Sequence, residues 1–122
     1  MKISKRANVN RYYLLKFFGL GVFLHKIHHS DPEVFHSHPW SWFSIIFGSY
    51  WENRVFGRWR KRTLFNFCKY GHCHRVVIDK PVWTLFFHGR RQGTWIVTDK
   101  TGEILETNPW RGVDNQDRVD YV

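Results

Sequence analysis

The chain has 122 residues, a length that allows one domain with one hydrophobic core. Its formal net charge is +9, and 19% of its residues are aromatic. No uninterrupted apolar run approaches the roughly 18 residues of a membrane-spanning helix, and Lys16 breaks the apolar run near the N-terminus, so we expect neither a membrane segment nor a secretory signal. Two cysteines, Cys68 and Cys73, do not make a disulfide framework, and we expect reduced thiols in a cytoplasmic protein.

The excess of positive charge favours anionic partners, which include nucleic acid, nucleotides and other small anionic molecules. The alternative is that the charge serves only solubility, and composition does not decide between the two.

The first half of the chain is expected to contain a basic flexible arm over residues 1–10. Residues 11–18 form an apolar segment that fits a strand or a short helix. Residues 22–28 predict a strand that ends at the turn residues 30–32. A long apolar and aromatic run then continues from His36 to Glu52, and its β-branched and aromatic residues favour a strand.

The second half predicts further short strands separated by turns. A basic loop or hairpin is expected over residues 54–62, with Gly57 at its turn. The expected strands are 63–67, 74–78, 82–88 and a hairpin of 94–98 with 103–106. Residues 108–122 are a polar tail, which leaves 11–107 as a single domain.

Many short strands, regular turn signals and no convincing long helix predict an all-β sandwich or barrel. The central run is apolar on both faces, as Phe43 and Ile45 show against Trp42 and Ile46. One face must therefore pack within the sheet layers while the other lines an enclosed space.

Histidines are the residues most suggestive of chemistry. His36 and His38 are two positions apart at the start of the central strand, so their side chains project from the same face of the strand and could bind one metal ion. A second such pair, His72 and His74, offers a third ligand, and strand alternation alone does not choose between its members. His25 and His88 face either the enclosed space or a sheet rim.

A composite motif extends this pattern, and it resembles the cupin superfamily. It is similar to the small single-domain cupins of bacterial and phage genomes, whose pattern includes HxHPW, HRV and KPxWTL. The matching stretches are Leu24-His25, Ser30-Asp31, His36 to Trp40, Ser44, Gly48 to Glu52, His74 to Val76 and Lys80 to Leu85. The resemblance covers roughly residues 20 to 95 and implies a jelly-roll barrel, the double-stranded β-helix.

The resemblance also implies a divalent metal ion held by His36, His38 and His74. Gly71 three positions before His74 matches its second motif, which favours His74 over His72. The sequence departs from the general cupin pattern in two places. Trp42 or Phe43 stands where a glutamate normally follows the histidine pair, and Lys69 replaces a proline. Glu52 and His72 are further ligand candidates.

Three neutral imidazoles suit Fe(II) first, with Zn, Ni or Mn as alternatives. The set resembles the thiol dioxygenase branch of cupins, so an Fe(II) oxygenase acting on a small polar or anionic substrate is one hypothesis. A non-catalytic module that binds an anionic nucleotide or metabolite is the other. The candidate substrate-binding residues are Tyr50, Arg75, Thr84, His88, Arg90 and Arg91.

Basic side chains surround Trp59 in the sequence and form a second candidate binding surface. Such a surface could bind phosphates or stacked bases, but the same pattern is also typical of a solvated loop without a binding role. Its residues are Arg58, Trp59, Arg60, Lys61 and Arg62. Nonspecific nucleic-acid binding here is the weaker functional alternative, because no recognition helix is present. A structural zinc site of Cys68, Cys73, His72 and His74 is disfavoured by its spacing. A homodimer is expected only by analogy with other cupins.

Overall fold

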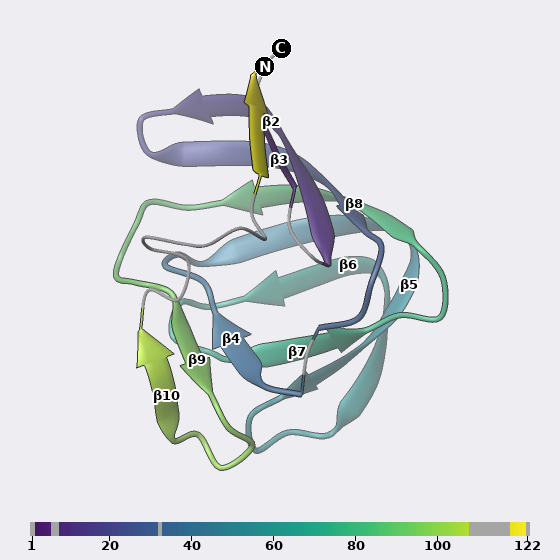
Figure 1. Cartoon of the computed structure of the whole chain (residues 1–122), viewed down its shortest axis with the longest axis vertical. Helices are drawn as coiled ribbons and strands as arrows, with labels where there is room; N and C mark the ends of the chain where they lie inside the picture. Colours follow the sequence, from purple (N-terminus) through teal and green to yellow (C-terminus); the bar gives the residue numbers. More distant parts are fainter. Residues whose placement is uncertain (1, 6–7, 32, 108–117, 122) are drawn as a thin grey trace.

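The computed structural model describes residues 2–5, 8–31, 33–107 and 118–121, and every regular element within them is a β-strand (Figure 1). The strands are β1 (Lys2–Lys5), β2 (Val9–Phe17), β3 (Leu20–Ile27), β4 (Phe35–Ser37), β5 (Trp42–Arg54), β6 (Trp59–Cys68), β7 (His74–Val77), β8 (Val82–His88), β9 (Ile96–Thr98), β10 (Ile104–Thr107) and β11 (Arg118–Tyr121). The predicted all-β class is confirmed. In this described part of the chain, no helix has the length and apolar character that a membrane crossing needs.

All strand pairs are antiparallel, and the sheet order is β10-β9-β4-β7-β5-β8-β3-β2-β1-β11, with β6 also paired to β5. The long strand β5 joins the parts of this sheet. Its first half pairs with β8, its second half pairs with β7, and β6 runs along its other edge. Figure 1 shows β4, β7 and β9 side by side in the lower part of the view, with the β2–β3 hairpin at the top.

Strand β5 keeps one face turned inward over its whole length. Its even-numbered residues, from Trp42 to Glu52, are buried apart from Gly48. The pairing with β6 shifts between Ile46 and Ser49, so a bulge interrupts the ladder there. Gly48 has a φ of +136°, which is accessible to glycine but strained for other residues. The bulge leaves the alternation intact, so Tyr50 and Glu52 face the same interior as Trp42.

The buried apolar residues form two clusters inside the sheet. The first contains Phe23, Trp40, Trp42, Cys68 and Phe86, with Tyr13 and Trp95 packed against it. The second contains Ile46, Tyr50, Val76 and Val82, with Ile27 and Ile78 beside it. The first cluster is mostly aromatic, and the histidines described below lie against it.

The opposite face of β5, β6 and β8 leaves large apolar side chains exposed. Phe43 is paired with Phe67 on one side and Phe87 on the other, and the Phe43 and Phe65 rings stack with centroids 5.7 Å apart. Phe65 and Phe67 are 58% and 55% exposed. We call this surface the outer aromatic face.

The ends of the chain differ from the flexible arm and polar tail that the sequence analysis expects. Residues 2–5 form β1, which pairs with β2, and residues 118–121 form β11, which pairs with β1. Residues 108–117 of the expected tail lie outside the described residues. The expected hairpin of 94–98 with 103–106 is present as β9 and β10.

Candidate metal centre

Three histidines come together because β4 and β7 are neighbours in the sheet. His36 in β4 is paired directly with His74, the first residue of β7, so both side chains leave the same face. His38 lies just past the end of β4 and returns to that face because strand side chains alternate. The three residues that the sequence analysis selects are therefore one group in space.

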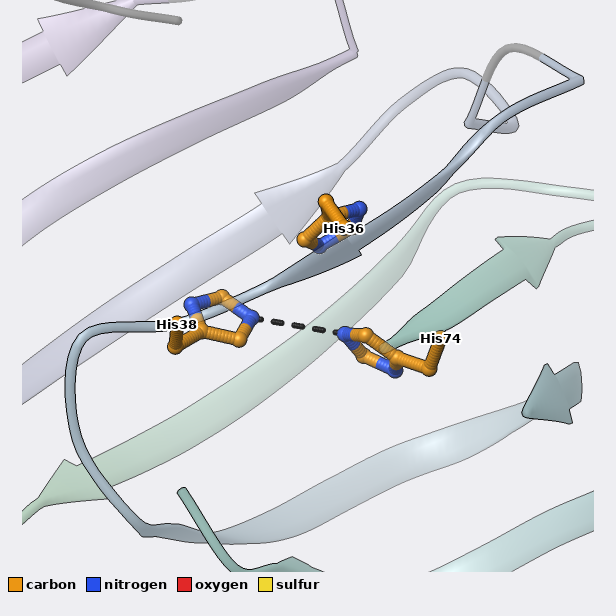
Figure 2. A group of neighbouring side chains, drawn as sticks. All are labelled: His36, His38 and His74. Carbon is orange, nitrogen blue, oxygen red and sulfur yellow. Dashed lines mark hydrogen bonds between the residues drawn. The ribbon is translucent and has the colours of Figure 1, made fainter. Parts of the chain in front are cut away.

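The geometry of this group fits a shared ion. One ring nitrogen of each histidine lies within 4.8 Å of the other two. Figure 2 shows the His38 and His74 rings turned toward each other, with 3.3 Å between their Nε2 atoms. An ion about 2.1 Å from each nitrogen requires the nitrogens to lie no more than about 4.2 Å apart. The rings would therefore draw together slightly around an ion.

A carboxylate orients His74. Nδ1 of His74 lies 2.7 Å from Oε2 of Glu52, and an ionised carboxylate only accepts, so Nδ1 donates. In a neutral imidazole this leaves the lone pair on Nε2, the atom that faces His38. Glu52, one of the further ligand candidates, therefore contacts the Nδ1 side of the His74 ring and not Nε2, the atom that would bind a metal ion.

Glu52 itself is held by several donors. Its Oε1 accepts hydrogen bonds from Nε of Arg54 at 2.9 Å and Nε of Arg62 at 3.0 Å, and Asn66 donates to Oε2 at 2.9 Å. Burial raises the pKa of Glu52, but the hydrogen bond and charge of His74 and the charge of Arg54 outweigh burial and lower it to about 2. The carboxylate is therefore ionised at neutral pH.

A second carboxylate lies behind His36. Nδ1 of His36 is 3.8 Å from Oδ2 of Asp31, which is longer than a hydrogen bond. Asp31 is fixed to β7, since its carboxylate accepts from the Val76 backbone amide at 2.7 Å and its own amide donates to the Val76 carbonyl at 2.8 Å. Two of the three imidazoles therefore have an acidic side chain on the Nδ1 side.

His38 is held among aromatic rings. Its ring stacks on Trp40 with centroids 5.1 Å apart and lies 4.6 Å from Trp95. Burial, followed by the neighbouring His36 and His74, lowers the pKa of His38 well below its ordinary value. Its Nδ1 is buried and has no hydrogen-bond partner among the described residues. His38 is thus neutral at pH 7, which is the form that binds metals.

Among the described residues, this is the only group of three or more His, Cys, Asp or Glu side chains with ligand atoms this close together. Three neutral nitrogen donors leave other coordination positions open. The alternative zinc site does not form in this part of the chain. The only group of close ligand atoms among the described residues is that of His36, His38 and His74, which contains neither cysteine. Burial raises the pKa of Cys68 to about 11, so without a metal ion its thiol is protonated.

Three of the predicted substrate-binding residues, Tyr50, Thr84 and His88, are buried and face inward. Tyr50 belongs to the second apolar cluster, where its hydroxyl accepts a 2.8 Å hydrogen bond from Asn66 and burial raises its pKa. His88 stacks on Trp40 with centroids 4.3 Å apart and donates from Nδ1 to the Gly89 carbonyl. Burial lowers the pKa of His88, so it is neutral at pH 7.

The predicted arginines lie elsewhere. Arg75 leaves the opposite face of β7 from His74 and lies over the Trp59 ring at 5.6 Å. Arg90 and Arg91 are exposed beyond the end of β8, so the structure does not bring these arginines to the histidines. His72 is exposed, because β7 begins only at His74 and strand alternation does not extend back to it.

Four members of the predicted basic surface are exposed, namely Arg58, Trp59, Arg60 and Lys61. Arg62 differs from them, since it pairs with buried Glu52. One basic residue of the expected surface therefore belongs to the support of the histidine group.

Sequence reasoning assigned no role to Arg11, which is buried in β2 and donates from Nε to Nε2 of His25 at 3.0 Å. His25 is buried in β3 and therefore faces the interior, one of the two placements left open above. Residues 11–18 were ambiguous between strand and helix, and the alternation that points Arg11 inward is evident only when they form a strand.

Comparison with known proteins finds structures of similar fold but no relative by sequence. No family model matches the chain, and no curated protein matches it. A double-stranded β-helix protein from Klebsiella pneumoniae is similar in structure, with a TM-score of 0.60, 13% identity and coverage of 76% of this chain and 86% of that one. KdgF from Halomonas sp. has a TM-score of 0.54, 15% identity and coverage of 70% and 83%.

A substrate complex of FeII HppE is also similar, with a TM-score of 0.57, 9% identity and coverage of 67% of this chain and 50% of that one. At such identities the likeness concerns the fold. The chain has a double-stranded β-helix fold, as the sequence motifs imply.

Proposed function

We propose that this chain is a metal-binding cupin that holds one divalent transition-metal ion through His36, His38 and His74. The observation that carries the proposal is the 3.3 Å separation of the Nε2 atoms of His38 and His74. Nδ1 of His74 donates a hydrogen bond to Glu52, so in its neutral form His74 presents the lone pair of Nε2 to His38. In one tautomer of His38, Nε2 donates its proton to this lone pair; in the other, Nε2 faces it with a second lone pair, and a metal ion between the two atoms would bind both.

Fe(II) is the metal that we propose first, with Zn, Ni and Mn as alternatives. Neutral imidazoles suit Fe, Zn and Ni well, whereas Mn prefers oxygen ligands. One of the structural neighbours is described with FeII, which supports this order. Bound Fe(II) would supply the redox chemistry for oxidation of a small polar or anionic substrate by O2.

The chain's own residues orient the ligands and exclude water. Glu52 fixes the ring of His74, and Asp31 lies behind His36. The rings of Trp40 and Trp95 pack against His38. A site enclosed by aromatic rings has a low effective dielectric, which strengthens the attraction between an ion and an anionic substrate.

The second candidate function is a module that binds a small anion without turnover. It is favoured by the absence of a carboxylate from the histidine group among the described residues, because metal affinity would then depend on neutral ligands alone. Stabilisation of the chelator-treated protein by nucleotides or organic anions would support this candidate, whereas stabilisation by metal alone would count against it.

The test is the metal content of protein purified without chelator, measured by mass spectrometry. The wild type should carry about one equivalent of a transition metal. The His74→Ala variant should lose stoichiometric metal, because only two ligands remain. The matched control is His72→Ala, since His72 lies two residues away and is exposed. It should keep its metal.

Two results would contradict the proposal. One is wild-type protein with less than a tenth of an equivalent of metal and no uptake on reconstitution. The other is loss of metal from His72→Ala with retention in His74→Ala, which would place the third ligand on a different residue.

A further inference from the structure

The end of the β2–β3 hairpin carries apolar side chains outside the core. Every residue from Leu14 to Leu20 is exposed, and most of them are large and apolar. Figure 1 shows the turn of this hairpin at the upper left of the view. We call its apolar residues the hairpin tip, and their exposed fractions range from 47% to 75%: Leu14, Leu15, Phe17, Phe18 and Leu20.

The hairpin tip extends past the strands on either side of it. Toward the turn, the ladder between β1 and β2 ends at Tyr12, and the ladder between β3 and β8 ends at Gly21. Among the described residues, Leu15 to Phe17 of β2 therefore pair with β3 alone. A two-stranded hairpin is only marginally stable in water by itself. Its exposed apolar side chains could be buried only against a partner.

The backbone of the turn disfavours the residue at its centre. Phe18 and Gly19 have φ angles of +47° and +79°, as in the type I′ turn of a two-residue hairpin, where Asn-Gly is the preferred pair. A bulky residue at positive φ is strained, because its Cβ crowds the neighbouring carbonyl oxygen. The Phe18 ring is 75% exposed and contacts the Phe17 ring, with centroids 4.3 Å apart. The turn thus holds an aromatic ring in solvent at a cost in backbone energy.

The charged residues of the tip and of the turn after β8 are basic. Lys16 is exposed between Leu15 and Phe17. Arg90 is also exposed and lies against the turn, since a Cβ added to Gly19 would be 3.4 Å from its Cγ. The stretches that form β1, β2, β3 and β8, residues 1–30 and 80–98, contain no Asp or Glu. Apolar side chains therefore protrude next to positive charge.

We infer that the hairpin tip inserts into the surface of an anionic lipid bilayer. This inference goes beyond the proposed function and does not require a bound metal ion. A contact at the bilayer surface needs apolar side chains at the boundary of the acyl chains and basic side chains at the depth of the headgroups. Phe17, Phe18 and Leu20 supply the apolar part, and Lys16 and Arg90 supply the charge.

Other partners fit the hairpin tip less well. A second copy of the chain on the tip would bring the same positive charges together, which opposes association. A single-stranded nucleic acid would match the charge, but its bases bind by stacking on aromatic rings, and the exposed leucines of the tip offer none. An anionic bilayer matches both features, because a layer of negative charge covers an apolar interior.

The test is co-sedimentation with vesicles, made either of phosphatidylcholine alone or with about 30% phosphatidylglycerol. The wild type should bind the anionic vesicles about tenfold more tightly than the neutral ones. Phe18→Asn removes the ring and places the preferred residue in the turn, so the variant should be at least as stable as the wild type. It should bind the anionic vesicles about tenfold more weakly, because burial of a phenylalanine side chain is lost.

Phe56→Asn is the matched control. Phe56 also has a positive φ, of +64°, and is 87% exposed, but it lies in the turn between β5 and β6, with its ring near Gly102. Figure 1 shows the β9–β10 turn, which contains Gly102, at the bottom of the view and the β2–β3 hairpin at the top. Phe56→Asn should therefore leave vesicle binding unchanged.

A second pair of variants tests the charge. Lys16→Gln should weaken binding to the anionic vesicles by about fivefold, the usual effect of one basic residue at an anionic surface. Lys100→Gln removes an exposed lysine from the β9–β10 turn and should have no effect. Circular dichroism checks that all four variants are folded.

Several results would overturn the inference. They are absence of wild-type binding, equal binding to neutral and anionic vesicles, and equal binding by the wild type and folded Phe18→Asn. Loss of binding in Lys16→Gln alone would mean adsorption by charge without insertion. A wild-type dimer in sedimentation velocity that Phe18→Asn dissociates, without vesicle binding, would instead place a second copy of the chain on the hairpin tip.

Discussion

At the scale of single residues, Glu52 determines how His74 is presented. The carboxylate receives four hydrogen bonds, two on each oxygen, from Arg54, Arg62, Asn66 and His74. Only an ionised carboxylate can accept from all these donors. Glutamine would replace one acceptor oxygen by an NH2 group, which would face N–H donors and could not serve them.

Glu52→Gln should therefore weaken metal affinity by about 10- to 100-fold, the range typical of residues that orient a metal-binding histidine. The measurement is competition with a chelator of known affinity. Glu103→Gln is the control, because Glu103 is exposed. Unchanged affinity in Glu52→Gln would mean that the bond to His74 does not influence the metal site.

At the scale of strands, the β5–β6 hairpin brings Arg62 to this carboxylate. Arg62 is paired with Tyr50 in the ladder, beyond the bulge at Gly48, and this register places it next to Glu52. Arg58 precedes β6 and is exposed. Two arginines four positions apart thus have different surroundings, although both belong to one basic stretch of sequence.

Arg62→Ala should lower the free energy of unfolding by about 1–3 kcal/mol, because it removes a donor from a buried charge. Arg58→Ala should change it by no more than about 0.5 kcal/mol, the usual size for an exposed site. Urea unfolding followed by circular dichroism measures both. Equal effects of the two substitutions would place Arg62 among the solvated residues of the basic surface.

At the scale of the whole molecule, the sequence predicts the strand-rich fold well because alternation and turn residues are local signals. The histidine group was predictable because His36 and His38 share a face, and because the motif resemblance around His74, which opens a later apolar strand, indicated the third member. Arg11 was not predictable, since its contacts with His25 depend on which strands become neighbours. The same holds for Arg62, whose partner is set by ladder register.

Stability against acid also belongs to this scale. The pKa of Glu52 is about 2 in the folded protein, against an ordinary value of 4.5. Because the pKa of Glu52 is lower in the folded protein than in the unfolded chain, ionised Glu52 contributes to the free energy of unfolding. This contribution is complete above the pKa of the unfolded chain and is lost as the pH falls from 4.5 toward 2. It amounts to at most about 3 kcal/mol at neutral pH.

The free energy of unfolding of the wild type, measured in urea by circular dichroism, should therefore decline across this window. Glu52→Gln should be less stable at pH 7 and should show a shallower decline, so the two curves converge at low pH. Parallel curves would assign the acid sensitivity to other groups.

The outer aromatic face has a practical consequence for such measurements. Phe43, Phe65 and Phe67 offer adjoining apolar rings on the folded protein. Fluorescent dyes that respond to exposed apolar surface would find a binding surface before any unfolding begins. Their signal would start high and rise little on heating, and dye-based melting curves would understate the cooperativity of a transition that the backbone signal reports directly.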